Sequence, residues 1–162
     1  MGNAAITETS QFLTFKLAEE VFGVDISQVK EVLEYTPMTK MPQMPDYMCG
    51  VINLRGHAVP VTDMRSKFDM PAAERTVNTC IIIVEVATKE GEMVIGAMAD
   101  SVKEVMTLEP DQVEPPPKVG TKLRTEFIRG MGKQEERFII LLDTDKVFSA
   151  DELVDDVNYS TA

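Results

Sequence analysis

A repeated segment is the feature of this sequence that most restricts how it folds. The tetrapeptide Val-Lys-Glu-Val at residues 29–32 recurs at residues 102–105, an offset of 73 positions (102 − 29). At the same offset Gly23 corresponds to Gly96, and an apolar residue precedes each glycine. One short match alone carries little weight, so a duplication needs periodic support elsewhere in the chain.

A second pair of matching segments supports the duplication. Gly50 and Asp63 bracket one apolar strand pattern. At an offset of 80 positions (130 − 50 and 143 − 63), Gly130 and Asp143 bracket another. A loop insertion between the two matched segments accounts for the change of offset from 73 to 80. The sequence therefore predicts a chain built from two related halves.

The length and charge of the chain limit what kind of protein it is. Its 162 residues, 44% of them hydrophobic, are enough for one domain with a buried core. The net charge of −11 disfavours binding to nucleic acid or to anionic lipid headgroups. The longest apolar runs are too short to span a bilayer, and the polar first residues lack a secretory signal. We therefore expect no nucleic-acid partner and no direct membrane insertion.

The chain divides into a central domain and two short ends. We expect a leader at residues 1–10, a single domain at residues 11–150 and an acidic helix or tail at residues 151–162. The repeat places the first half of the domain at about residues 11–75 and the second half at about residues 79–150. Exchange of strands between the halves is compatible with this division.

Short segments that alternate apolar and polar residues predict a fold made mainly of strands. Helical patterns are few and short, and one of them rests on a capping box at Ser101 and Glu104. Many short strands with little helix favour a barrel or a sandwich. The expected strands are residues 12–17, 21–26, 32–35, 50–54, 57–62, 79–86, 93–98 and 138–142, and the expected helical turns lie within 25–33, 64–68, 101–106 and 146–156.

A methionine-rich stretch at residues 36–46 stands apart from these elements. It holds three prolines, and Met38, Met41 and Met44 follow one another at a spacing of three. In an extended polyproline path this spacing places the three side chains on one ridge. Two interpretations remain open, because methionine suits an adaptable partner surface and also packs well as a cap over a barrel of the same molecule.

The hairpin pattern between Gly50 and Asp63 carries the most information about a binding surface. A two-residue turn that begins at Arg55 pairs residues 50–54 with residues 61–57. Arg55 then stands at the hairpin tip, where its planar donor group can engage a carboxylate or carbonyl of a partner. An internal ion pair with Glu31 is the alternative, and the sequence leaves both open.

The residues needed for common catalytic sites are scarce. His57 is the only histidine, so Ser-His, Cys-His and metal clusters have little to draw on. Cys49 and Cys80 lack metal-ligand spacing and are expected to be reduced thiols. Asp63 and Asp143 fit the strand-end position of a phosphoacceptor aspartate, but a receiver domain needs many more helices. We therefore expect no enzyme, no metal and no cofactor.

Several motifs together resemble the CheW chemotaxis coupling-protein family. The resemblance covers about residues 11–149, and its most specific part is Asn-Leu-Arg-Gly at residues 53–56 followed by Val-Pro-Val at residues 59–61. The other matching motifs lie at residues 22–26, 29–32, 96, 100–105, 130 and 139–143. A receiver-like phosphoacceptor and a protein-binding barrel outside chemotaxis are the two alternative functions.

The resemblance implies a fold, a function and a location. The fold would be all-β with short helices, in which two five-stranded SH3/OB-like β-barrels from an internal duplication pack together. The function would be that of a non-catalytic adaptor in the cytoplasm, held at the inner face of the membrane through receptor arrays. It would link methyl-accepting chemoreceptors to the regulatory domain of the CheA histidine kinase, and it could assemble into rings with kinase domains or other adaptors.

The resemblance also implies a set of receptor-binding residues. In the family, receptors dock in the groove between the barrels, close to the hairpin arginine. The positions that match in this sequence are Arg55, Glu31, Val29, Val102 and Gly96. The resemblance leaves the residues that contact the kinase unassigned.

Overall fold

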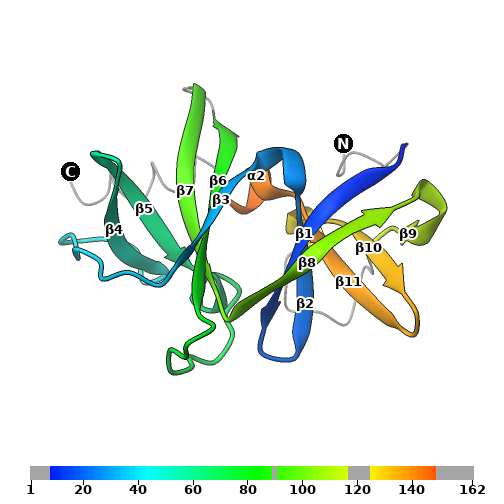
Figure 1. The fold of residues 1–162 in the computed structure, drawn as a ribbon, viewed down its shortest axis with the longest axis horizontal. Helices are drawn as coiled ribbons and strands as arrows, with labels where there is room; N and C mark the ends of the chain where they lie inside the picture. The colour runs from blue at the N-terminus through cyan, green and yellow to red at the C-terminus, as the bar shows by residue number, and fades with distance from the viewer. Residues whose placement is uncertain (1–7, 89–90, 117–124, 149–162) are drawn as a thin grey trace.

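The computed structural model describes residues 8–88, 91–116 and 125–148, which form two β-sheets side by side (Figure 1). The α-helices and 3-10 helices of this part of the chain have three or four residues each. The strands are β1 (Ser10–Leu17), β2 (Glu20–Asp25), β3 (Val29–Glu34), β4 (Met48–Leu54), β5 (His57–Asp63), β6 (Cys80–Thr88), β7 (Gly91–Ala99), β8 (Ser101–Leu108), β9 (Val113–Glu114), β10 (Ile128–Gln134) and β11 (Arg137–Leu142). The α-helices are α1 (Met64–Lys67) and α2 (Thr144–Val147), and the 3-10 helices are η1 (Ile26–Gln28), η2 (Pro110–Gln112) and η3 (Thr125–Phe127).

The two sheets share one plan of strand order. Sheet A runs β8-β1-β2-β11-β10-β9, and sheet B runs β3-β6-β7-β5-β4. Each sheet contains one parallel pair, β2 with β11 in sheet A and β5 with β7 in sheet B. The expected all-β fold of two packed units with short helices is confirmed. Sheet A has a sixth strand because the two-residue strand β9 pairs with β10.

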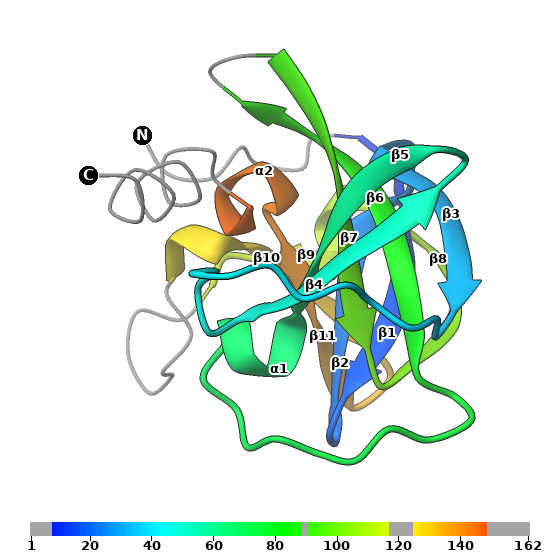
Figure 2. The same ribbon diagram turned by 90° about the vertical axis from the view of Figure 1, so that its left-hand side faces the viewer.

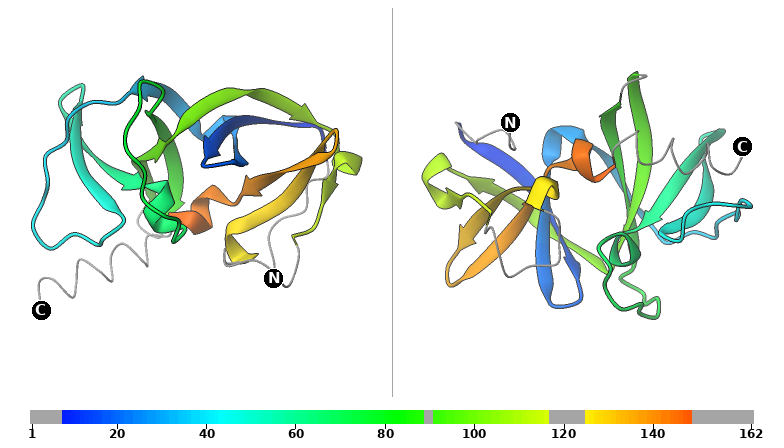
Figure 3. Two further views of the ribbon diagram at one scale, coloured as in Figure 1. Left: turned by 90° about the horizontal axis from the view of Figure 1, so that it is seen from below. Right: turned by 180° about the vertical axis from the view of Figure 1, so that it is seen from behind.

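The path of the chain links the two sheets, because strands of sheet A both precede and follow those of sheet B. All strands of sheet B come from the continuous stretch between β3 and β7, whereas sheet A combines β1 and β2 with the later strands β8 to β11. Each half of the sequence therefore gives strands to both sheets, as strand exchange between two halves requires. In the right-hand view of Figure 3, α2 lies above α1 in the region between the two sheets.

Local sequence explains the hairpin that joins β4 and β5. Its register pairs Leu54 with His57 and Ile52 with Val59, as the sequence predicts. The turn residues Arg55 and Gly56 have φ angles of 51° and 85°. Positive φ at both central residues is what a tight hairpin turn of type I′ needs, and glycine adopts it without steric cost.

Three apolar clusters form the core, and one of them joins the two sheets. One belongs to sheet A, with Phe12 and Leu141 among its members, and one belongs to sheet B. The third is shared by both sheets and contains Phe15, Phe22 and Phe68, whose rings stack in sequence with centroids 5.6 Å apart. Strand β6 contributes to two clusters, because alternate side chains point to opposite faces of a strand. Its residues Ile81 and Ile83 join the sheet B cluster, and Ile82, Val84 and Val86 join the shared one.

Two helix expectations are corrected by the structure. Residues 101–106 form most of strand β8 and not a helix. The Ser101–Glu104 capping pattern is local, and pairing of β8 with β1 along its length prevails over it. Near residue 25, helix is limited to the three residues of η1, which Asp25 begins by accepting a hydrogen bond from the Ser27 N–H. Strand β3 therefore starts at Val29, earlier than the expected residue 32.

Some expectations concern the two ends of the chain. Strand β1 begins at Ser10, the last residue of the expected leader. Residues 1–7 and the expected acidic helix or tail at residues 151–162 lie outside the described residues. Within the described part of the chain, no helix is long and apolar enough to cross a membrane.

Candidate docking surface

Arg55 and Glu31 form a two-pronged ion pair. The Arg55 Nη1 and Nη2 groups donate to the Glu31 Oε2 and Oε1 atoms at 2.5 and 3.0 Å. Glu31 lies in β3 and Arg55 in the turn after β4, and these strands are the two edges of sheet B. The internal pairing that the sequence left open is therefore formed, and it connects the two edges of the sheet.

The same pair remains open to a partner. The Arg55 side chain is 70% exposed, whereas that of Glu31 is 26% exposed. Hydrogen bonds from Arg55 lower the pKa of Glu31, and hydrogen bonds to Glu31 raise the pKa of Arg55. Exposed ion pairs contribute little to stability, so the effect of this one is to hold the guanidinium in a fixed orientation.

Val29 and Val102 hold equivalent places in the two repeats. Each is the first valine of its Val-Lys-Glu-Val segment, is half-buried, and packs against the apolar cluster that both sheets share. The last valine of each segment, Val32 in β3 and Val105 in β8, is 43% and 48% exposed. The repeated tetrapeptides thus anchor one edge strand of each sheet and leave an apolar side chain on the surface.

A groove lies beside these edge strands. Its cavity measures about 280 Å³ and is bounded by β3, the start of β6 and the start of β8. We call this cavity the seam groove. Val102 lines it directly, whereas Val29, Glu31 and Arg55 lie outside its wall. The residues that line it are Val32, Leu33, Glu34, Val77, Asn78, Thr79, Cys80, Ser101 and Val102.

Gly96 does not belong to an exposed surface. It is buried in β7, paired with Val61 of β5 on one side and Ile83 of β6 on the other. A Cβ atom at this position would lie 2.8 Å from the Ile81 Cγ2 atom. The place of Gly96 in the fold is to let strands pack closely, and its predicted receptor contact stays a prediction.

A second cavity, of about 520 Å³, is formed by the methionine-rich stretch, which passes along sheet B between β3 and β4 (Figure 2). Backbone hydrogen bonds between Thr39 and Val51 attach this stretch to β4. Met38 packs against the sheet B cluster, while Met41 is 51% exposed. The stretch therefore caps sheet B and also offers thioether side chains to solvent. The spacing of the methionines did not predict this cavity. The residues that line it are Tyr35, Met38, Lys40, Met41, Gln43, Met44, Pro45, Asp46, Met48, Cys49, Asp63 and Met98.

The residues that the sequence suggests for phosphate transfer or metal binding have structural roles. The Asp63 carboxylate accepts hydrogen bonds from backbone N–H groups at the start of α1, and the Asp143 carboxylate does the same at the start of α2. Burial, together with the charge of Asp63, raises the pKa of the Cys49 thiol to about 12. Among the described residues, no group of three or more His, Cys, Asp or Glu side chains could hold a metal ion.

Comparison with known proteins shows which family the chain belongs to. The model of the CheW-like domain matches residues 11–152. The chain belongs to the CheW family. Chemotaxis protein CheW of Klebsiella aerogenes is 37% identical over 156 residues, which cover 95% of this chain and 92% of that protein. Chemotaxis protein CheW of Rhizobium meliloti is 35% identical, with 94% and 97% covered.

A solved CheW structure has the same fold. The scaffolding protein TtCheW from Thermoanaerobacter tengcongensis superposes with a TM-score of 0.76 at 34% sequence identity. The match covers 86% of this chain and 92% of TtCheW. The family resemblance that the hairpin motif carried is thereby confirmed, and so is the fold that it implied.

Proposed function

We propose that this chain is a non-catalytic adaptor that couples the cytoplasmic tips of chemoreceptors to the CheA histidine kinase. The observation that carries this proposal is its likeness to chemotaxis CheW proteins, at 37% identity along 95% of the chain for one relative and 35% along 94% for another. The two candidate phosphoacceptor residues, Asp63 and Asp143, serve as helix caps, which speaks against the receiver-like alternative. An adaptor of this kind works in the cytoplasm, at the inner face of the membrane where its receptors are.

The receptor-facing surface that we propose contains Arg55, Glu31, Val29 and Val102. It combines one exposed guanidinium with the half-buried valines of the two edge strands. A partner that offers a carboxylate or backbone carbonyls to Arg55 and apolar side chains to the seam groove would satisfy both kinds of contact. The guanidinium is already oriented by Glu31, so less side-chain entropy is lost when a partner binds.

Coupling would arise from contacts shared between partners. A receptor that binds one signalling state of the assembly more tightly shifts the kinase toward that state. Because many such units act together in an array or ring, each interface can be of modest strength. Mixed rings with kinase domains or other adaptors would use this multivalency.

Reconstitution tests the proposal directly. Kinase autophosphorylation is measured with membrane-embedded receptors, in the presence and absence of this chain. We expect receptor control of the kinase only when the chain is present, and no phosphate incorporation into the chain itself. Control that is unchanged by the chain, or stable labelling at Asp63 or Asp143, would contradict the adaptor function.

Charge reversal tests the surface. Arg55→Glu should weaken receptor binding about tenfold, equivalent to ~1.4 kcal/mol, while binding of the kinase stays near that of the parent. The matched control is Lys133→Glu, which breaks the exposed ion pair with Glu114 on sheet A. The double variant Glu31→Arg with Arg55→Glu restores an internal pair with its charges exchanged. If receptors contact Arg55, this double variant stays defective, and full recovery would show that only the internal pair matters.

A further inference from the structure

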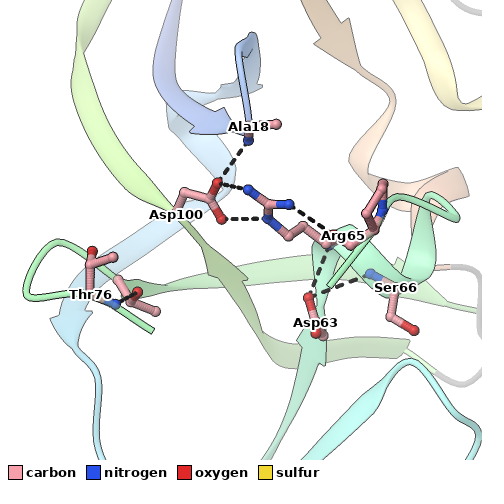
Figure 4. A network of polar contacts seen from close by, with 8 residues as sticks. Ala18, Asp63, Arg65, Ser66, Thr76 and Asp100 are labelled. Carbon is pink, nitrogen blue, oxygen red and sulfur yellow. Dashed lines mark hydrogen bonds and ion pairs between the residues drawn. The ribbon is translucent and has the colours of Figure 1, made fainter. Parts of the chain in front are cut away.

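Asp100 lies where the chain passes from sheet B to sheet A, between β7 and β8 (Figure 4). Its Oδ2 atom accepts a hydrogen bond of 2.7 Å from the Ala18 N–H, in the β1–β2 turn of sheet A. Its Oδ1 and Oδ2 atoms accept from the Arg65 Nε and Nη2 groups at 2.9 and 2.5 Å, and Arg65 belongs to α1, directly after β5 of sheet B. One carboxylate therefore joins elements of both sheets.

The partners of Asp100 are themselves held in place. The Arg65 side chain is only 16% exposed, and its Nη1 group donates to the Pro71 carbonyl at 2.8 Å. The backbone N–H of Arg65 donates to the Asp63 carboxylate at 3.0 Å. Ala18 has a φ angle of 56°, in the left-handed region, and its N–H points at Asp100 from the turn. We call Ala18, Arg65 and Asp100 the Asp100 junction.

A second junction repeats this arrangement at the other end of the seam. The Asp145 Oδ1 atom, in α2 after β11 of sheet A, accepts a hydrogen bond of 2.9 Å from the Ala87 N–H of β6 in sheet B. The same oxygen accepts from the Gln28 Nε2 group at 2.9 Å, and Gln28 lies on η1 between the sheets. The Asp145 junction thus has a neutral donor where the Asp100 junction has an arginine.

We infer that the Asp100 junction sets the orientation of sheet A relative to sheet B, and so positions the two sides of the receptor-docking surface. The apolar cluster between the sheets supplies adhesion that depends little on direction. Charge-assisted hydrogen bonds are directional, and a bidentate arginine–carboxylate pair is the most geometrically specific of them. Contacts at both ends of the seam restrict rotation of one sheet over the other.

This orientation matters because the docking surface spans both sheets. Glu31 and Arg55 belong to sheet B, whereas Val102 belongs to β8 of sheet A, two residues after Asp100. The inference rests on the proposed function for this consequence. Asp100 and Arg65 act as positioning residues: they hold the surface in shape without touching the partner. Weakening the junction should therefore impair receptor control of the kinase more than binding of the kinase alone.

The test combines NMR with reconstitution on the full chain. Residual dipolar couplings report the relative orientation of the two sheets, and the 18.0 kDa chain is a suitable size. Asp100→Asn removes the charge at constant shape, and Arg65→Met removes the donors while leaving the Ala18 bond. Lys133→Met is the matched control, because it breaks an exposed ion pair within sheet A alone. Thermal unfolding of each variant reports whether it folds.

We expect both junction variants to alter the inter-sheet orientation and Lys133→Met to leave it unchanged. Receptor control of the kinase should fall about fivefold or more, while binding of the kinase alone changes less than about twofold. Arg65→Lys should recover part of the control that Arg65→Met loses.

Unchanged dipolar couplings in both folded variants would overturn the inference, as would altered orientation with full receptor control. If the parent chain fails to couple receptors to the kinase, the proposed function fails, while the couplings still decide whether the junction sets the orientation.

Discussion

At the scale of single residues, the two glycines matched by the repeat show how little space lies between neighbouring strands. A Cβ on Gly96 would lie 2.8 Å from Ile81 Cγ2 and 3.1 Å from Val61 Cγ2. A Cβ on Gly23 would lie 3.1 Å from Leu141 Cδ2, the end of a more flexible side chain. The repeat therefore preserves a packing requirement at both positions, and the requirement is stricter at Gly96.

Substitution of Gly96 separates packing from binding. Gly96→Ala should lower the free energy of unfolding by about 1–3 kcal/mol, because the added methyl group overpacks the sheet B core. Gly23→Ala is the control and should cost less, since the Leu141 side chain can move. Urea unfolding measures both. If Gly96→Ala keeps the stability of the parent but loses receptor binding, then Gly96 is a contact residue after all.

At the scale of elements, strand β8 depends on one buried side chain of β1. The register between these strands shifts between Leu13 and Phe15, and Thr14 lies at that irregularity, 1% exposed. The Thr14 Oγ1 group donates to the Glu104 carbonyl at 2.7 Å and accepts from the Glu104 N–H at 3.1 Å. A hydroxyl group thus replaces backbone pairing where the ladder is interrupted.

Removal of this hydroxyl tests its contribution to β8. Thr14→Val keeps the shape but leaves the Glu104 backbone groups unpaired, so it should destabilise the protein by about 1–3 kcal/mol. Hydrogen exchange at the Glu104 amide should also accelerate. The control is Thr107→Val at an exposed position of β8, expected within about 0.5 kcal/mol of the parent. Equal stability of the two variants would show that the Thr14 bonds do not support the strand.

Elements that depend on local sequence could be predicted, whereas contacts between distant segments could not. The β4–β5 register followed from a two-residue turn, because turn and pattern are local. The local sequence of β8 favours a helix, whereas its pairing with β1 depends on residues 90 positions apart, such as Thr14 and Glu104. The repeat match located Gly96 but gave no direction in which it faces. The Asp100 junction could not be predicted from the sequence, since Ala18 and Arg65 lie 82 and 35 positions from Asp100.

At the scale of the whole molecule, sheet B is inserted into the chain of sheet A. The chain leaves sheet A at η1 and returns through Asp100, so each passage between sheets lies beside one junction. Asp25, at the first passage, accepts a hydrogen bond of 3.1 Å from Arg129 of β10. Ionised carboxylates therefore stand at both passages. Two ion pairs, Asp25–Arg129 and Asp100–Arg65, therefore lie where the chain passes between the sheets.

These carboxylates link the stability of the molecule to pH. Hydrogen bonds from Arg65 lower the pKa of Asp100, against the opposing effect of burial. Burial alone would raise the pKa of Asp25, but hydrogen bonds from Ser27 and Arg129 outweigh it and the pKa is lowered. A carboxyl group with a pKa below its unfolded value stabilises the fold above the unfolded pKa, and this contribution is lost as the pH falls through the folded pKa. Stability should therefore decline below about pH 4, near the ordinary aspartate pKa of 3.8.

A comparison of variants isolates the part of this decline that comes from the Asp100 junction. Asp100→Asn should unfold at a lower temperature than the parent at neutral pH, and the difference should shrink as the pH falls below about 4. Asp111→Asn, an exposed residue of η2, carries the same change of net charge and should follow the parent curve. Thermal unfolding between about pH 3 and pH 7 measures both. A constant difference across that range would show that ionisation of Asp100 adds nothing to the junction, because the parent would then lose no stability by protonating it.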